Sequence, residues 1–250
     1  MYRIGIDLGG TNIAVGIVDE NYKIISSAKV KTNAPRPAEE IAHDMAGAVK
    51  TALKNAGLSL DDVKSVGIGT PGSVIRETGV VVYANNLGFF DVPLGKMLEE
   101  KLGKKVLIEN DANAAAFGEY IAGAGKGTKN FIALTLGTGV GGGIISDGKI
   151  YAGSNYAGGE LGHTVIQMNG EACTCGRNGC FEAYASATAL IRQTKQAMIR
   201  FPKSIMWDLC GNDLNNVGGR TAFDAMRQGD EAGTAVVEEY TKYVAVGVSN

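Results

Sequence analysis

The feature that most constrains the fold of this chain is a glycine-tipped β-hairpin that occurs twice. The opening segment reads as a strand, a turn at Gly9-Gly10-Thr11-Asn12 and a returning strand, and the same order recurs around Gly137-Thr138-Gly139. One offset in numbering superposes the two motifs, placing Leu8-Gly9 on Leu136-Gly137. The repeat predicts two related halves, each opening with the same hairpin. Two such lobes, facing each other, would form a cleft with one Gly/Thr loop on each side.

Between and after the hairpins, segments with strand and helix patterns alternate. Apolar residues recur at helical spacing over residues 38–56, residues 63–68 form a short apolar strand, and residues 111–122 form an alanine-rich helix. This alternation predicts an α/β fold with a partly parallel core sheet. We expect a small N-terminal lobe over residues 1–110 and a larger lobe over residues 111–250.

Charge and composition argue against several classes of protein. The formal net charge is −2 and the Lys and Arg residues are scattered, so the chain lacks the basic stripe of nucleic-acid-binding proteins. No amphipathic basic segment or long apolar run indicates a membrane partner, and the start at Met1 does not resemble a signal peptide. We therefore expect a cytoplasmic protein, in which the four cysteines are reduced and metal binding is favoured over disulfides.

The two glycine loops carry the features of a nucleotide site. Glycines let successive backbone N–H groups converge on phosphate oxygens, and Asp7, at the end of the first strand, could hold Mg²⁺ through water. The first loop is neither a Rossmann loop nor a Walker A loop, because a strand follows it and no Gly-Lys-Ser/Thr occurs. Each loop alone could be a simple hairpin turn, but the pair favours a nucleotide clamp. Its predicted residues are Asp7, Gly9, Gly10, Thr11, Asn12, Gly137, Thr138 and Gly139.

Asp111 lies where a predicted strand meets a predicted helix. It could be the helix N-cap, a position that Asp favours. It could also be a general base in the cleft, since phosphoryl transfer to an alcohol needs one carboxylate to orient the hydroxyl and accept its proton. The two roles are compatible, because a cap uses one carboxylate oxygen and leaves the other free.

Four potential zinc ligands follow within a short segment: His163, Cys173, Cys175 and Cys180. A structural zinc ion takes four such ligands in a tetrahedron, commonly three Cys and one His. A C-x-C pair can be a redox site, but the accompanying His and third Cys favour structural Zn²⁺. Cys210 is distant in sequence and is expected to be an ordinary free thiol.

Two carboxylates flank this cluster, Glu160 three residues before the histidine and Glu182 two residues after the last cysteine. Folding around zinc would bring them near each other, where they could accept hydrogen bonds from sugar hydroxyls. The alternative is that both are solvated loop acids.

Taken together, these segments resemble the ROK family (repressor, open reading frame, kinase), and within it the bacterial glucokinases. The residues that carry the resemblance are Asp7–Asn12, Thr70-Pro71-Gly72, Glu109–Ala114, Leu136–Gly139, Gly159–His163 and the run from Cys173 to Glu182. The resemblance implies a two-lobed actin-like, ribonuclease H-like ATPase fold with an inter-lobe cleft. It implies that Asp111 is the catalytic base, and that His163 holds zinc through one ring nitrogen while the other faces the sugar. The sugar-binding residues it implies are Gly72, Asn86, Asn110, Asp111, Glu160, His163 and Glu182.

The reaction implied by the resemblance is ATP-dependent phosphorylation of the 6-hydroxyl of D-glucose, a step of glycolysis, by a homodimer or homotetramer. Fructose, mannose and N-acetylmannosamine are alternative substrates on the same scaffold, although the stretch from Tyr184 to Thr188 looks glucokinase-like. A non-catalytic sugar-sensing regulator and an actin-like ATPase of chaperone or cytoskeletal type are the alternatives from other classes.

The chain departs from the family pattern in two respects. Family repressors carry a DNA-binding segment before the motif that here begins at Asp7, so a DNA-binding part is not expected. Family kinases continue beyond the point that corresponds to Asn250, with a glycine-rich segment that holds adenosine. We therefore expect the adenine-binding residues to lie outside these 250 residues, with weak ATP binding and poor stability; full kinase activity in this form would contradict that expectation.

Overall fold

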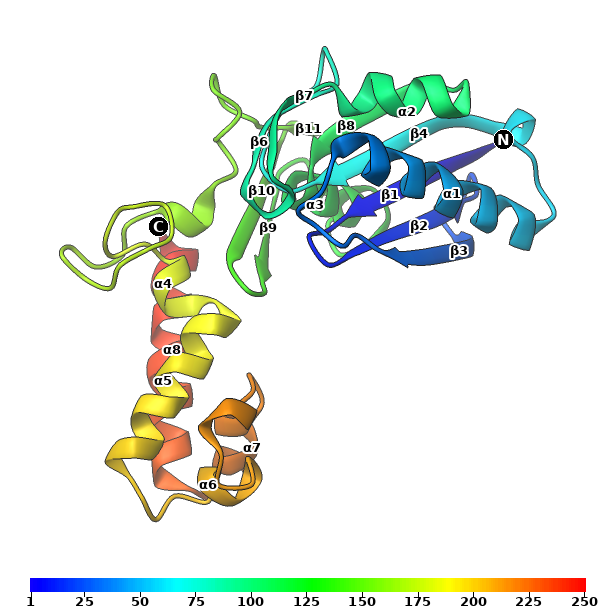
Figure 1. Ribbon diagram of the computed structural model, residues 1–250. Helices are drawn as coiled ribbons and strands as arrows, with labels where there is room; N and C mark the ends of the chain where they lie inside the picture. Colours follow the sequence, from blue (N-terminus) through cyan, green and yellow to red (C-terminus); the bar gives the residue numbers. More distant parts are fainter. The chain divides into compact units, whose positions relative to one another are not determined.

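The computed structural model describes residues 1–250 and contains two compact units, whose elements are labelled in Figure 1. Unit 1 comprises Met1–Ala133 and Gly143–Gly159, and unit 2 comprises Leu134–Gly142 and Glu160–Asn250. The predicted lobes follow the sequence repeat and do not coincide with these units. The division at residues 110 and 111 stays a prediction.

A mixed five-stranded sheet organises unit 1, in the order β3-β2-β1-β4-β8. The three strands β1, β2 and β3 pair antiparallel, while β1 with β4 and β4 with β8 pair parallel, so the predicted partly parallel sheet is confirmed. The register pairs Asp7 with Gly69 and Gly69 with Glu109, so the carboxyl ends of the parallel strands meet at one edge. The strands are β1 (Tyr2–Leu8), β2 (Asn12–Val18), β3 (Ile24–Lys31), β4 (Val63–Thr70) and β8 (Val106–Asn110).

One face of this sheet carries the core of unit 1. Alternate residues of β1 and β2 are buried, and helices α1 (Ala38–Ala56) and α2 (Leu94–Leu102) cover them. Full burial of one such Leu, Ile or Val side chain contributes roughly 1.5–3 kcal/mol. Helix α1 has the bounds expected from its apolar spacing and ends at Gly57, whose φ of 68° favours glycine.

A small antiparallel sheet, which the sequence patterns did not indicate, lies between β4 and α2 in the chain. Its strands are β5 (Ser73–Ile75), β6 (Val80–Ala84) and β7 (Phe89–Val92), in the order β5-β6-β7. Short 3₁₀ turns at Leu60–Asp62 and Asn85–Leu87 precede β4 and β7. This sheet places its first strand directly after Gly72, beside the end of β8.

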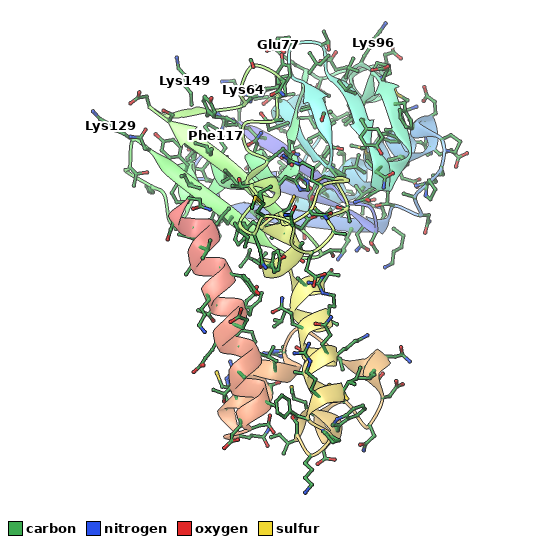
Figure 2. The ribbon with its side chains drawn as sticks, turned by 90° about the vertical axis from the view of Figure 1, so that its left-hand side faces the viewer. Lys64, Glu77, Lys96, Phe117, Lys129 and Lys149 are labelled. Atoms are coloured by element: carbon green, nitrogen blue, oxygen red, sulfur yellow. The ribbon has the colours of Figure 1, made fainter.

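The second glycine-tipped hairpin is present as predicted. Strands β9 (Phe131–Leu136), β10 (Val140–Ser146) and β11 (Lys149–Ile150) form a three-stranded sheet, whose tip, Leu134–Gly142, belongs to unit 2. At its other end, the Gly148 N–H donates to the Lys129 carbonyl over 3.0 Å, and Lys129 and Lys149 lie near each other in Figure 2.

Unit 2 is mainly helical. Its longest helices, α5 (Ala187–Arg200) and α8 (Glu231–Ser249), pack against each other, and α7 (Thr221–Arg227) packs on α8. Asp230 caps α8 by accepting from the Gly233 N–H and also accepts from Ser204 Oγ, which ties two loops together. None of the helices combines the length and the apolar run that crossing a bilayer requires. The short elements are α4 (Glu182–Ala185), α6 (Met206–Leu209) and 3₁₀ turns at Leu161–His163 and Leu214–Asn216.

Candidate active site

The junction between β8 and α3 (Asp111–Ala122) carries Asp111, and Asn110 is its N-cap. The Asn110 Oδ1 atom accepts from the N–H groups of Ala112 (3.0 Å) and Asn113 (3.1 Å), two donors of the first turn that have no partner within the helix. Asp111 is instead the first residue of the helix, with Oδ1 accepting only from the Ala112 N–H over 2.8 Å. The idea that Asp111 caps the helix is therefore wrong, and its carboxylate retains free acceptor capacity.

Glycines hold the backbone of this junction between two strands. A Cβ on Gly69 of β4 would lie 3.5 Å from the Asp111 Cα atom, and a Cβ on Gly143 of β10 would overlap Ala116 of α3. Because neither position has a side chain, the first turns of α3 pack directly against strand backbone on both sides. The position of Asp111 is thus set by close packing.

The electrostatic setting of Asp111 raises its pKa. Desolvation is the largest cause, and the nearby negative charge of Asp7 adds to it, while the hydrogen bond from the Ala112 N–H acts in the opposite direction. The residue still exposes part of its surface. A carboxylate with a raised pKa and an open face is a better proton acceptor than a fully solvated one.

Of the other predicted sugar-binding residues of unit 1, Asn110 and Gly72 lie at this junction and Asn86 lies beside the first glycine loop. The Asn110 Nδ2 group donates to the Gly72 carbonyl over 3.1 Å, so the cap residue also holds the start of β5. Gly72 has a φ of 88°, and a Cβ there would collide with the Tyr83 carbonyl, so only glycine fits. Asn86 lies beside Gly10, with its Cβ atom 3.4 Å from the position a Gly10 Cβ would take.

The first glycine loop connects β1 and β2 in unit 1. The Gly9 N–H donates to the Asn12 carbonyl over 3.0 Å, and Thr32 Oγ1 donates to the Gly9 carbonyl over 2.6 Å. Thr32 is fully buried and also donates its N–H to the Thr11 carbonyl over 3.0 Å. One buried threonine therefore fixes both sides of the loop, a contact that the sequence patterns did not reveal.

The second glycine loop, in unit 2, is fixed by the start of α5. The Ala187 N–H donates to the Gly137 carbonyl and Thr188 Oγ1 donates to the Thr138 carbonyl, both over 2.8 Å. A Cβ on Gly139 would collide with the Glu182 carboxylate, whose Oε2 accepts from the Val140 N–H over 2.9 Å. Glu182 thus contacts the loop directly, and its Oε1 accepts from Thr174 Oγ1 over 3.2 Å.

The four predicted zinc ligands come together in unit 2. One ligand atom from each of His163, Cys173, Cys175 and Cys180 lies within 4.8 Å of all the others. The Cys175 and Cys180 sulfurs are 3.6 Å apart, and a zinc tetrahedron with Zn–S bonds of about 2.3 Å separates its sulfurs by roughly 3.8 Å. The donor set and its spacing therefore fit one zinc ion.

The thiols of the chain differ in their surroundings. The Arg177 backbone N–H lowers the pKa of the Cys175 thiol, whereas burial raises that of Cys180. The thiolate is the form that binds zinc, so metal binding would release the protons of the three cysteines. Cys210 lies apart, buried in the helical core, with its thiol donating to the Trp207 carbonyl.

His163 points its two ring nitrogens in different directions. Its Nδ1 atom is 3.6 Å from the Cys173 sulfur, while its Nε2 atom is 4.0 Å from Glu160 Oε2. This arrangement is compatible with the predicted double role, in which one ring nitrogen binds zinc and the other faces the sugar; the sugar contact itself stays a prediction.

The candidate residues form two sets, one in each unit. The set in unit 1 is Asp7, Gly9–Asn12, Gly72, Asn86, Asn110 and Asp111. The set in unit 2 is Gly137–Gly139, Glu160, His163, the three cysteines and Glu182.

An expected effect on stability follows from the cap. Replacing Asn110 by Ala should destabilise unit 1 by about 1 kcal/mol, because the Asn113 N–H loses its side-chain acceptor and the Ala112 N–H keeps only Asp111 Oδ1. Asn110→Asp keeps the acceptor and should lose much less; urea unfolding of the two variants measures the difference. Equal stability of Asn110→Ala and the wild type would mean that Asp111 can take over the cap.

Comparison with solved structures defines the class of fold. The structure matches a ROK family glucokinase from Streptomyces griseus, solved with glucose and AMPPNP, at a TM-score of 0.83 and 38% identity, covering 99% of this chain and 78% of that one. The chain therefore has the actin-like ATPase fold that the resemblance implied.

The family model described as "ROK family" matches residues 3–250, and the chain belongs to the ROK family. A glucokinase of Thermotoga maritima is 40% identical over 228 residues, covering 91% of this chain and 70% of the relative. A xylose repressor of Bacillus spizizenii is 32% identical, covering all of this chain and 60% of the repressor. The family thus includes both enzymes and regulators.

Proposed function

We propose that this protein is an ATP-dependent glucokinase that transfers the γ-phosphoryl group of ATP to the 6-hydroxyl of D-glucose. Identity of 36–40% to four glucokinases supports this function over that of the xylose repressors, at 29–34%. The observation that carries the proposal is the Asp111 carboxylate, which is partly exposed, is not the helix cap and has a raised pKa.

The chemistry assigned to each residue follows from its surroundings. Asp111 would accept the proton of the 6-hydroxyl as that oxygen attacks the γ-phosphorus and the bond from phosphorus to the β-phosphate oxygen breaks. Asn110 and Gly72 would orient the sugar beside it, and Asn86 would line the pocket. The resemblance to the family assigns further contacts with the sugar hydroxyls to Glu160, His163 and Glu182.

The glycine loops would bind ATP through their backbone N–H groups, with the Thr11 and Thr138 hydroxyls and Asn12 completing the two loops. Asp7 would hold the Mg²⁺ that accompanies ATP, because carboxylate oxygen is a ligand this cation prefers and Asp7 lies near enough to Asp111 to raise its pKa. The zinc ion would shape the loop that presents His163 and Glu182, with no part in the phosphoryl step.

We further propose that the enzyme works in the cytoplasm in glycolysis, as a homo-oligomer without a nucleic-acid partner. The scattered basic residues and the net charge of −2 support the absence of nucleic acid. A coupled assay of ADP release with glucose, fructose, mannose and N-acetylmannosamine tests the substrate. The fastest turnover with glucose is expected, whereas no turnover with any sugar together with retained sugar binding would favour a regulator.

The raised pKa of Asp111 predicts the pH dependence of both activity and stability. Because the base must be ionised, the apparent pKa of the acid limb of the kcat/KM profile should lie above the ordinary carboxyl value of 3.8.

The same shift affects stability. Because the pKa of Asp111 is higher in the folded state than in the unfolded state, wild-type stability falls as pH rises between those two pKa values. Asp111→Asn cannot ionise and so avoids this loss of stability. The variant should have a larger free energy of unfolding than the wild type at neutral pH but not at acid pH, and urea unfolding at the two pH values measures the difference. A less stable Asn variant at neutral pH would contradict the predicted shift.

A further inference from the structure

An ion pair outside the residues discussed so far supports the junction that carries Asp111. Arg76, in the turn between β5 and β6, places Nε 2.8 Å from Glu109 Oε2 at the end of β8. Only 29% of the Arg76 side chain and 16% of the Glu109 side chain are exposed. The Nε and Nη2 atoms of Arg76 are both buried and make no hydrogen bond of good geometry, so the contact with Glu109 is a largely desolvated ion pair, and Arg76 is the cation that Glu109 contacts.

The second oxygen of Glu109 is committed to the residues on either side of Asp111. Its Oε1 atom accepts from the Asn110 N–H over 2.9 Å and from Asn113 Nδ2 over 3.2 Å. Asn113 is itself almost fully buried. One carboxylate therefore joins Arg76 to the residue before Asp111 and to the first turn of α3.

The turn that carries Arg76 is fixed independently of the junction. The Gly79 N–H donates to the Ile75 carbonyl and the Gly95 N–H, at the start of α2, donates to the Gly79 carbonyl, both over 2.9 Å. The Tyr156 hydroxyl donates to Glu77 Oε2 over 2.9 Å. Figure 2 shows Glu77 and Lys96 at the same margin of unit 1, where this turn meets α2.

We propose that Arg76 is a positioning residue, which acts through Glu109 to hold Asn110 and Asp111 in place for the transfer of the phosphoryl group to sugar. The inference rests on the proposed glucokinase function. Without the guanidinium, the largely buried Glu109 carboxylate loses its cationic partner and turns toward solvent, which alters its bonds to Asn110 and Asn113. A shift of about 1 Å in a catalytic group can cost roughly 10²-fold in rate.

The test compares Arg76→Met with Arg76→Lys in a steady-state assay at saturating ATP. For Arg76→Met we expect kcat to fall roughly 30-fold and the KM for glucose to rise several-fold, because both Asp111 and Asn110 are displaced. The KM for ATP should stay within about twofold, since the Gly9–Asn12 loop has its own support from Thr32. Arg76→Lys keeps the charge and should recover most of the lost kcat.

A double variant separates this role from a loss of stability. Arg76→Met with Glu109→Gln removes the charge that lacks a partner, while the amide oxygen can still accept from the Asn110 N–H. We expect it to fold and to be more active than Arg76→Met alone, so the two effects are not additive. Arg227→Met, which breaks the exposed pair between Arg227 and Asp224, is the matched control and should leave all three constants unchanged.

The outcomes are distinguishable. An inactive wild type would overturn the glucokinase function. If the wild type is active, two results for Arg76→Met would overturn the positioning role. In the first, kcat and both KM values are unchanged. In the second, kcat falls only in proportion to the folded fraction while both KM values are unchanged. If Arg76→Met does not fold, the double variant is measured against Glu109→Gln, and equal kcat and KM values in the two would also overturn it.

Discussion

Replacing Asp111 by Asn should lower kcat for glucose phosphorylation roughly 10³-fold, because the amide cannot accept the proton of the 6-hydroxyl. The fold should remain intact, since Asn110 and not Asp111 is the helix cap. Glucose affinity should change little, because an amide of the same shape can still hydrogen-bond a hydroxyl. A coupled ADP-release assay and titration calorimetry with glucose measure the two quantities separately.

The control for this variant is Asp61→Asn, a substitution in the exposed 3₁₀ turn before β4. It should leave both kcat and glucose affinity unchanged. If Asp111→Asn retained more than about a tenth of wild-type kcat, Asp111 could not be the general base, which contributes 10²-fold or more. If Asp111→Asn lost glucose binding as well as turnover, Asp111 would have a role in binding alone.

The second large effect concerns the cysteine cluster. Cys180→Ser should reduce zinc content from about one ion per chain to almost none, because a neutral hydroxyl is a poor substitute for a buried thiolate. A ligand held at about 100 times its Kd stabilises the folded state by roughly 2.7 kcal/mol, so the Tm should fall by roughly 5–10 °C. The KM for glucose should rise roughly tenfold, because the loop bearing His163 and Glu182 loses its support.

Cys210→Ser is the matched control, because this thiol is also buried but lies in the helical core outside the cluster. It should keep its zinc, and its glucose KM should match that of the wild type. Metal analysis of both variants, with thermal unfolding and glucose kinetics, completes the experiment. Zinc retained in Cys180→Ser, or lost in Cys210→Ser, would show that the ligand set is wrong.

Much of the fold could be predicted because it depends on local patterns. Helices α1 and α3 have the predicted bounds, since the apolar spacing of one and the alanine-rich run of the other specify them. The zinc ligands were also predictable, because all four lie in one short stretch of chain whose glycines allow tight turns. Both glycine loops were predictable as well, because each hairpin is a continuous stretch of chain and its motif occurs twice.

Features that depend on contacts between distant segments could not be predicted. The small β5-β6-β7 sheet consists of strands of three to five residues, too short to show a period. The pairing of Arg76 with Glu109 joins the turn between β5 and β6 to the end of β8 in a different sheet, and no spacing along the chain encodes it.

The β8–α3 junction shows most clearly which features the sequence predicts and which depend on the tertiary structure. The sequence by itself determined that an acid would stand at a strand–helix boundary, because the apolar run ends there and a run rich in alanine follows. Only the tertiary structure decided that Asn110 caps the helix and that Asp111 stays free, with its pKa raised by burial and by Asp7. The physical reason is the parallel pairing of β1, β4 and β8, which brings the ends of distant strands to one edge and sets the charges around the carboxylate.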